Sequence, residues 1–347
     1  MMKKLIFISL IAISFFTSCK NEDNEFADYK YTTVYFPYQY PVRTIVLGKD
    51  LYDNSLDLAH KCKIMATMGG VYSNNSDRIL DVEVDNSMFD TLLFDGEAGK
   101  YILPMPSNYY TLPSNMQIVI PAGSISGGIE VQLTDAFFAD KKSTQATYVI
   151  PLRIKSVKNA DSILSGKAAV TNPNLFVASD WSIAPKNYIL YCIKYINPWH
   201  GAYLRRGVDV GKGSAGYSKY DTVLTYHKQY VERDTIAKMY TVSMNECLMT
   251  VKTRNARSKK DVTFSLIIKV DDAGKCVVSA PDTVSYKISG TGEFVKDGDM
   301  WGGVKQDVMR LKYSVDFDTI THTLTDTLVM RDRQVVMQTF TPAILKK

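Results

Sequence analysis

The sequence predicts an all-β protein with two domains. Three observations support this prediction. Apolar and polar residues alternate along many short segments, these segments are rich in β-branched and aromatic side chains, and no stretch keeps a helical apolar stripe for three turns. The chain has 347 residues, of which 46% are apolar and 11% aromatic, so it can bury a substantial core and is long enough for two domains.

Residues 1–18 are predicted to be a lipoprotein signal peptide. Lys3 and Lys4 form a short basic region, residues 5–16 are apolar but too few to span a bilayer, and small residues precede Cys19. Residues 16–19 resemble a lipobox, in which the cysteine thiol receives a diacylglycerol, although Phe16 stands where Leu is commonest. The alternative is an ordinary signal peptide in which Cys19 has no special role.

Residues 19–31 are predicted to be a flexible acidic tether, because they are polar and lack apolar periodicity. The run after Cys19 resembles the acidic export signals of Bacteroidetes surface lipoproteins. No later segment reaches 18 uninterrupted apolar residues. We therefore expect an outer-membrane protein, exposed at the cell surface and held by its N-terminal lipid anchor.

Residues 32–182 are predicted to form the first domain, an immunoglobulin-like β-sandwich. Its strands alternate in polarity and are punctuated by Gly, Pro, Asn or Asp. They are expected at residues 33–36, 44–47, 63–67, 79–84, 117–120, 129–133 and 148–154. The segment 161–182 is richer in small and polar residues, which predicts the last edge of this domain and a linker.

Residues 183–347 are predicted to form the second domain, an antiparallel, lipocalin-like β-barrel or a wrapped sandwich. Residues 199–203 place an aromatic pair before a glycine, as at the start of a barrel strand, and residues 271–274 predict a hairpin turn. Strands are expected at residues 189–196, 202–208, 221–231, 239–252, 262–270, 276–279, 284–288, 308–317 and 321–330.

Two sets of motifs resemble known Bacteroidetes lipoproteins. Residues 117–134 and 148–154 are similar to the N-terminal Ig-like domain of surface lipoproteins, a domain that also precedes the catalytic barrel of some family-18 endo-β-N-acetylglucosaminidases. The second half resembles the C-terminal domain of uncharacterised two-domain lipoproteins of the same group, through residues 197–203, 292–294, 300–303 and 328–333.

This resemblance implies a surface lipoprotein of a Sus-type glycan-uptake system, which would bind glycans beside neighbouring transporter proteins. It does not imply endoglycosidase activity. After the first domain the sequence has neither a (β/α)₈ pattern nor the Asp-x-x-Asp-x-Asp-x-Glu run that such enzymes carry. We therefore expect a protein that is not an enzyme and needs no cofactor.

The net charge and the cysteine content argue against a nucleic-acid-binding protein and against a metal site. The formal net charge of +5 includes Lys3 and Lys4 of the expected signal peptide, so bulk charge does not indicate nucleic-acid binding. Four further cysteines show no CxxC pair and no histidine at ligand spacing, which disfavours a metal site. We expect buried free thiols, although a disulfide stays open because three pairings are possible among Cys62, Cys192, Cys247 and Cys276.

Several motifs match catalytic or binding patterns by letter only. Three carboxylates at residues 81–85 share one strand face, as on an ordinary solvated strand. Residues 211–216 match GxGxxG, but a strand is predicted after them instead of the required helix. The basic run 252–260 is expected to be a charged loop between strands. No nucleophilic triad can be defined from the dispersed residues His60, His200, His227 and His322.

Aromatic residues are the better candidates for a site. Sugars stack their C–H faces on Trp and Tyr, and their hydroxyls bind Asp, Asn, Gln or Arg. Trp301 lies in a glycine-rich turn next to Asp297 and Asp299, which makes these three residues the leading candidate glycan site. Trp199 and Tyr203 are further candidates, with the alternative that Trp199 closes the barrel floor.

Three functions remain open at this level. The leading hypothesis is a non-catalytic glycan-binding surface lipoprotein, in which the first domain is a spacer and the second holds the saccharide. The second is a structural or adhesive protein that engages a protein partner through strand edges or aromatic patches. The third is a glycoside hydrolase of unrecognised type, which requires two carboxyl groups about 5–10 Å apart in an open cleft.

Overall fold

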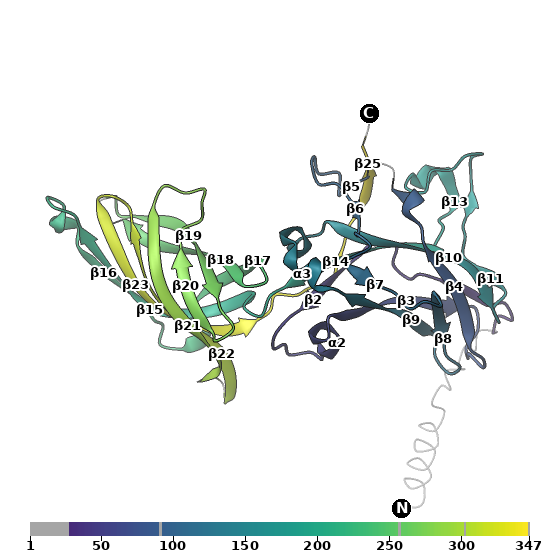
Figure 1. The fold of residues 1–347 in the computed structure, drawn as a ribbon, viewed down its shortest axis with the longest axis horizontal. Helices are drawn as coiled ribbons and strands as arrows, with labels where there is room; N and C mark the ends of the chain where they lie inside the picture. The colour runs from purple at the N-terminus through teal and green to yellow at the C-terminus, as the bar shows by residue number, and fades with distance from the viewer. Residues whose placement is uncertain (1–27, 90–91, 256–257, 302, 346–347) are drawn as a thin grey trace, which may run out of the picture.

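The computed structural model describes residues 28–89, 92–255, 258–301 and 303–345 (Figure 1). Strands account for 55% of the chain and helices for 8%, so the predicted all-β class is confirmed. Cys19 and the predicted signal peptide lie outside the described residues. Within the described residues, no helix is long and apolar enough to cross a membrane.

The first domain packs two sheets face to face. The five-stranded sheet has the order β11 (Ser162–Ile163), β1 (Thr33–Tyr35), β3 (Lys61–Gly69), β9 (Ser126–Leu133) and β7 (Tyr110–Thr111). The seven-stranded sheet has the order β24 (Gln338–Thr339), β2 (Pro41–Val46), β14 (Tyr188–Ile196), β10 (Tyr148–Lys158), β4 (Arg78–Val84) and β8 (Gln117–Ile120), and β6 (Leu103–Pro104) pairs with β10.

Alternation along these strands creates the sandwich core. Ile64 and Ile129 of the five-stranded sheet and Leu80, Ile118 and Ile193 of the seven-stranded sheet belong to one hydrophobic cluster, each with at most 1% of its surface exposed. Because successive side chains on a strand point to opposite faces, one apolar set from each sheet faces inward. The predicted sandwich is therefore confirmed.

Short elements complete the first domain. They are α2 (Ser55–Leu58), η2 (Asn86–Met88), α3 (Asp135–Ala139), η3 (Lys141–Thr144), the β12 (Lys167–Ala168) and β13 (Trp181–Ile183) pair, η4 (Ala178–Asp180), and β5 (Leu92–Phe94), which pairs with β25 (Pro342–Ile344). The last pairing brings the C-terminal segment of the chain onto the first domain (Figure 1).

Strand β14 belongs to the first domain, although its residues fall within the predicted second domain, 183–347. It pairs with β10 along six residues and runs parallel to β2 from Cys192 to Ile196. The domain boundary therefore follows β14, one strand later in the chain than the predicted boundary after residue 182. Sequence alternation identifies a strand but does not show which sheet it joins.

The second domain is a closed antiparallel barrel of eight strands. In order they are β15 (Gly201–Gly213), β17 (Thr235–Ser243), β18 (Glu246–Asn255), β19 (Lys260–Val270), β20 (Lys275–Ser279), β21 (Lys287–Trp301), β22 (Val304–Asp316) and β23 (Ile320–Asp332). Strand β23 pairs with β15 along its length and closes the ring. The barrel prediction is confirmed, and the wrapped sandwich is excluded.

Three features of the barrel differ from the predicted strands. The predicted strand 239–252 is a hairpin of β17 and β18. The predicted strand 221–231 is reduced to β16 (Thr222–Tyr226), which extends the pairing of β15, and is flanked by η5 (Ser218–Tyr220) and η6 (Val231–Arg233). Strands β21 and β22 continue far beyond the predicted segments into a long hairpin arm. The predicted turn at 271–274 is present, and Gly274 adopts φ +78° there.

The barrel core is formed by inward residues of every strand. Tyr203, Met249, Leu266, Leu311 and Leu324 are among its fully buried side chains. Free cysteines Cys247 and Cys276 lie in the same core, while Cys62 and Cys192 are buried in the first domain. All four thiols are free, which confirms the prediction and excludes the alternative of a disulfide among them.

Two chain crossings and several polar contacts join the domains. The chain leaves the first domain after β14 and returns from β23 to β24 (Figure 1). Arg333, which is 6% exposed, donates to the carbonyls of Lys49, Asn197 and His200 at 2.9, 2.6 and 2.8 Å. Lys49 also forms an ion pair with Asp297 at 2.6 Å. The junction is thus held by both backbone connections and side chains.

Candidate functional site

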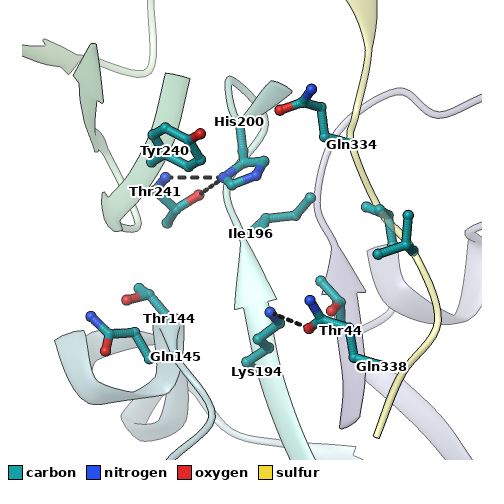
Figure 2. A pocket seen from close by; sticks show the side chains of 12 residues that line it. Thr44, Thr144, Gln145, Lys194, Ile196, His200, Tyr240, Thr241, Gln334 and Gln338 are labelled. Carbon is teal, nitrogen blue, oxygen red and sulfur yellow. Dashed lines mark hydrogen bonds between the residues drawn. The ribbon is translucent and has the colours of Figure 1, made fainter. Parts of the chain in front are cut away.

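A hollow of about 380 Å³ opens at the junction of the two domains (Figure 2). Its wall combines β2, β14 and the end of η3 from the first domain with β17 from the barrel, together with the segment that returns from β23 to β24. The lining residues are Thr44, Thr144, Gln145, Lys194, Ile196, His200, Tyr240, Thr241, Gln334, Val335, Val336 and Gln338. Ligand sites occur preferentially at such domain interfaces.

The strand register determines which side chains form the floor of the hollow. Lys194 lies opposite Thr44 in the parallel pairing of β14 with β2, so the two side chains emerge on the same sheet face. Tyr191 and Tyr195, on the other face of β14, pack into the sandwich core. A strand that is apolar on its core side therefore presents a lysine to the hollow on its other side.

His200 forms the wall next to the barrel. Its Nδ1 accepts a hydrogen bond from the Thr241 backbone N–H at 3.1 Å, and its ring meets that of Tyr240 edge to face at 5.8 Å. Burial, and then the nearby charges of Arg333 and Lys194, lower the pKa of His200 to about 4. The imidazole is therefore neutral at pH 7, and with Nδ1 as acceptor its proton is assigned to Nε2.

Lys194 supplies the charge of the hollow. Its Nζ donates to Oε1 of Gln338 at 2.7 Å, as Figure 2 shows. Burial lowers the pKa of Lys194. No carboxylate lies among the described lining residues, and within the described part of the chain the ammonium is paired only with a neutral amide.

A second hollow of about 530 Å³ adjoins the first and shares Thr144, Gln145, Lys194 and Gln338 with it. It holds two carboxylates that already have partners. Asp95 accepts from the Thr341 backbone N–H at 2.6 Å, and Glu97 pairs with Lys100. The two hollows together form an elongated space along the returning segment, which we call the junction groove.

The junction groove is equipped for hydroxyl-rich ligands. Tyr240 is 47% exposed and offers a ring face, and Gln145, Gln334 and Gln338 offer amides that both donate and accept. No group of three or more His, Cys, Asp or Glu side chains that could hold a metal ion occurs in the described ranges. The chemistry available here is stacking and hydrogen bonding.

The structure places Tyr203 in the barrel core and half-buried Trp199 against that core. Tyr203 is 0% exposed, and its hydroxyl donates to the Trp199 carbonyl at 2.7 Å. Trp199 packs against the barrel core and meets Phe294 edge to face at 6.2 Å. Tyr203 is therefore corrected to a core residue, because a wholly buried ring cannot stack on a ligand. The packing of Trp199 agrees with its alternative structural role, and its glycan role stays a prediction.

The other three predicted residues lie on the β21–β22 hairpin arm, away from the residues that line the junction groove. The Arg206 guanidinium lies 5.7 Å from the ring centre of half-buried Trp301. Asp297 pairs with Lys49, and Asp299 accepts from the Met300 backbone N–H at 2.8 Å. A cation already stacks on Trp301 and Asp297 is already in an ion pair, so the glycan role of this trio stays a prediction.

The remaining sequence motifs have structural roles. The carboxylates at 81–85 lie on β4 and the turn after it, and they pair with side chains of β8 and β10 such as Gln117, Arg153 and Lys155. Residues 211–213 end β15 and continue into a loop without the helix that a dinucleotide site requires. Residues 252–255 belong to β18, and 256–257 lie outside the described residues.

A buried polar cluster inside the barrel escaped the sequence analysis. Arg205 Nε donates to Asp326 at 2.9 Å, Tyr313 donates to the same carboxylate at 2.8 Å, and His322 Nδ1 meets Asp209 at 2.8 Å. Thr253 Oγ1 bonds to Asp209 and lies 3.0 Å from the same His322 nitrogen. In a catalytic triad the nucleophile and the acid bind opposite ring nitrogens, so this cluster does not have triad geometry.

Sequence reasoning missed the junction groove because the residues of its first hollow lie up to 294 positions apart in sequence, from Thr44 to Gln338. One signal was available. Lys194 interrupts an otherwise apolar run from Tyr188 to Ile196, where a buried strand gives no reason for a charge. Nothing in the sequence connects that lysine with Tyr240 or the glutamines.

Comparison with known proteins places the chain in a family. Residues 198–334, the barrel, match a domain of unknown function, DUF5627, and residues 29–161 match a family described as a "-like, N-terminal domain". A crystal structure from Bacteroides ovatus, described as of unknown function, is 41% identical, with a TM-score of 0.83 over 90% of this chain and 99% of that one. The chain therefore belongs to the same family as this Bacteroides ovatus protein.

More distant structures share little. Another Bacteroides ovatus protein of unknown function is 16% identical, with a TM-score of 0.42 over 88% of this chain and 97% of that one. An auxiliary nutrient binding protein from Bacteroides thetaiotaomicron is 12% identical, with a TM-score of 0.36 over 85% and 92%. Such low scores support no argument about this chain. No curated protein matches the sequence.

Proposed function

We propose that this protein captures glycans at the cell surface and that the junction groove is its binding site. The observation that supports the proposal is the lining of the groove, which combines one exposed tyrosine ring with hydroxyl and amide side chains. This composition suits a saccharide, whose C–H faces stack on aromatic rings and whose hydroxyls both donate and accept. The two adjoining hollows offer room for more than one sugar unit.

The proposal moves the saccharide from the barrel to the domain junction. The first domain then supplies half of the site and is not only a spacer. Binding would be passive, by stacking and hydrogen bonds, and involves no bond cleavage and no cofactor.

We further propose that Cys19 carries the lipid anchor, so that the protein sits on the outer membrane and delivers glycan to neighbouring Sus-type transporter proteins. The support is the signal-peptide pattern at residues 1–18 and the acidic residues after Cys19. Metabolic labelling with a fatty acid tests the anchor. Wild-type protein should incorporate label, and Cys19→Ala should not; equal labelling of both would overturn the assignment.

The binding test uses soluble protein from Asn21 onward, screened by affinity gel electrophoresis and calorimetry against plant and host polysaccharides. Any hit is then measured with Tyr240→Ala. Loss of the stacking surface should weaken binding about tenfold or more. The matched control is Tyr230→Ala, because Tyr230 is 49% exposed, close to the 47% of Tyr240, and lies outside the lining of the groove.

Other outcomes separate the alternatives. Loss of binding in Trp301→Ala with no effect of Tyr240→Ala would place the site on the hairpin arm. Release of reducing sugar from a hit would overturn the non-catalytic assignment. No binding to any polysaccharide would overturn the glycan proposal and favour a role in contact with a protein partner.

A further inference from the structure

In the first hollow of the junction groove, Lys194 is the one charged residue among the described lining residues. Lys194 projects into both hollows, and its only hydrogen bond in the described structure goes to the neutral amide of Gln338. In the second hollow, Glu97 forms an ion pair with Lys100, and Asp95 accepts from the Thr341 backbone N–H but keeps its negative charge. No ion pair of Lys194 is present among the described residues.

A second cation, Arg333, lies behind the wall that His200 forms. Arg333 is buried beneath His200 and its three hydrogen bonds all go to backbone carbonyls, while the carboxylates of Asp50 and Asp307 favour its charged form. Both Arg333 and Lys194 act on His200 and help to lower its pKa. Lys194 therefore faces the first hollow as a partly desolvated cation without a carboxylate among the described lining residues, and such a cation attracts an anion.

We propose that the saccharide bound in the junction groove is anionic, and that Lys194 binds its carboxylate or sulfate group. This inference rests on the proposed glycan-binding function and narrows it to acidic sugars. Thr44 lies beside Lys194 in register and offers a hydroxyl donor to the same anion. Figure 2 shows Ile196 between Lys194 and His200. Because Nδ1 of neutral His200 accepts from Thr241, its Nε2–H is the donor for a second ligand oxygen.

Gln338 completes the arrangement. Its amide oxygen holds the Lys194 ammonium in place without neutralising it. A glutamate at this position would form an ion pair within the groove and remove the attraction for an anion. The pairing of Lys194 with a neutral residue is therefore the feature that keeps the groove selective for anions.

The test compares ligands that differ only in charge. Oligogalacturonate and its methyl ester represent the carboxylate arm. κ-Carrageenan and its desulfated form, which is neutral because it contains no uronic acid, represent the sulfate arm. Calorimetry on the soluble chain from Asn21 should show about tenfold or tighter binding of one charged form than of its neutral partner, with affinity falling as salt rises.

Two variants assign the effect to Lys194. Lys194→Met keeps the aliphatic stem and should remove the preference for the charged form, whereas Lys269→Met, an exposed lysine on β19, should keep it. Gln338→Glu tests the same point without removing the lysine, and should also abolish the preference. This variant keeps the proposal testable if Lys194→Met fails to fold.

The outcomes separate this inference from the proposed function. Equal binding of charged and neutral forms, or an unchanged preference in folded Lys194→Met or Gln338→Glu, overturns the acidic-sugar inference and leaves glycan binding in place. Absence of binding to every charged and neutral saccharide overturns both.

Discussion

His200 shows how burial decides the properties of a single residue. The same histidine appears in sequence only as one of four dispersed histidines, yet the fold places it between Thr241 and the Arg333 side chain. Its pKa falls from 6.5 to about 4 because burial and two cations disfavour its charged form. It is therefore a permanent neutral donor at physiological pH.

This shift has a consequence for stability. Between pH 6.5 and pH 4 the unfolded chain binds a proton at His200 that the folded chain rejects, so the folded state loses stability as pH falls through that window. The loss is on the order of 2–3 kcal/mol. His200→Asn keeps an acceptor for Thr241 but cannot titrate. Urea unfolding at pH 7 and pH 4 should show a smaller decrease for this variant; equal decreases would contradict the assignment.

The four described cysteines give a second prediction for single residues. Burial raises the pKa of each thiol to about 12, so almost no thiolate exists near neutral pH. In soluble protein from Asn21 onward, a thiol reagent at pH 8 should react only after unfolding in urea, and then with all four thiols of Cys62, Cys192, Cys247 and Cys276. Rapid reaction of the native protein would contradict this burial.

Strand β15 illustrates what one element contributes to the barrel. Its inward side chains change from Tyr203 in the apolar core to Arg205 and Asp209 in the polar cluster, while Arg206 faces outward and pairs with Asp234. The glycine at 207 is required because a Cβ there would lie 2.3 Å from the Thr325 carbonyl oxygen of β23. One strand thus builds two layers of the interior.

The buried ion pair makes a prediction for this element. Arg205→Met would leave Asp326 buried without its cation, and burial already raises the pKa of this carboxyl. The expected loss is about 3–5 kcal/mol of unfolding free energy. Arg310→Met is the control, since its pair with Glu293 is exposed and should contribute about 1 kcal/mol or less. Similar losses in both variants would show that the cluster does not stabilise the barrel.

At the scale of the whole molecule, the C-terminal return joins the two domains into one unit. Residues 334–337 line the groove, and β24 then pairs with β2. Phe340 is 5% exposed and contacts Phe94 at 4.8 Å between ring centres. The groove therefore exists only while this segment is docked on the first domain.

Phe340→Ala should destabilise the protein by about 3–5 kcal/mol and weaken glycan binding, because it loosens the segment that carries Gln334 and Gln338. Val336→Ala, on the same segment but 65% exposed, is the stability control and should change the unfolding free energy by less than about 0.5 kcal/mol. Calorimetric unfolding measures both. An unchanged melting temperature for Phe340→Ala would indicate that the return is not part of the folded unit.

Much of the fold was predictable because strand alternation is local. The sandwich, the barrel, the free thiols and the turn before Gly274 all follow from residues close in sequence. The predictions were wrong where the structure depends on which strand a segment pairs with. Strand β14 was assigned to the wrong domain, and the β17–β18 turn was missed, because alternation continues through both places.

The candidate site could not be predicted from these local patterns. Aromatic type and nearby acids suggested Trp301 and Tyr203, but burial depends on what packs against a ring, and Tyr203 lies in the barrel core. The local pattern determines the all-β class, the two domains and the predicted anchor at Cys19. Tertiary structure alone decides that Lys194, His200, Tyr240 and Gln338 share one groove, because contacts between distant segments depend on sheet order and domain docking, which no local period encodes.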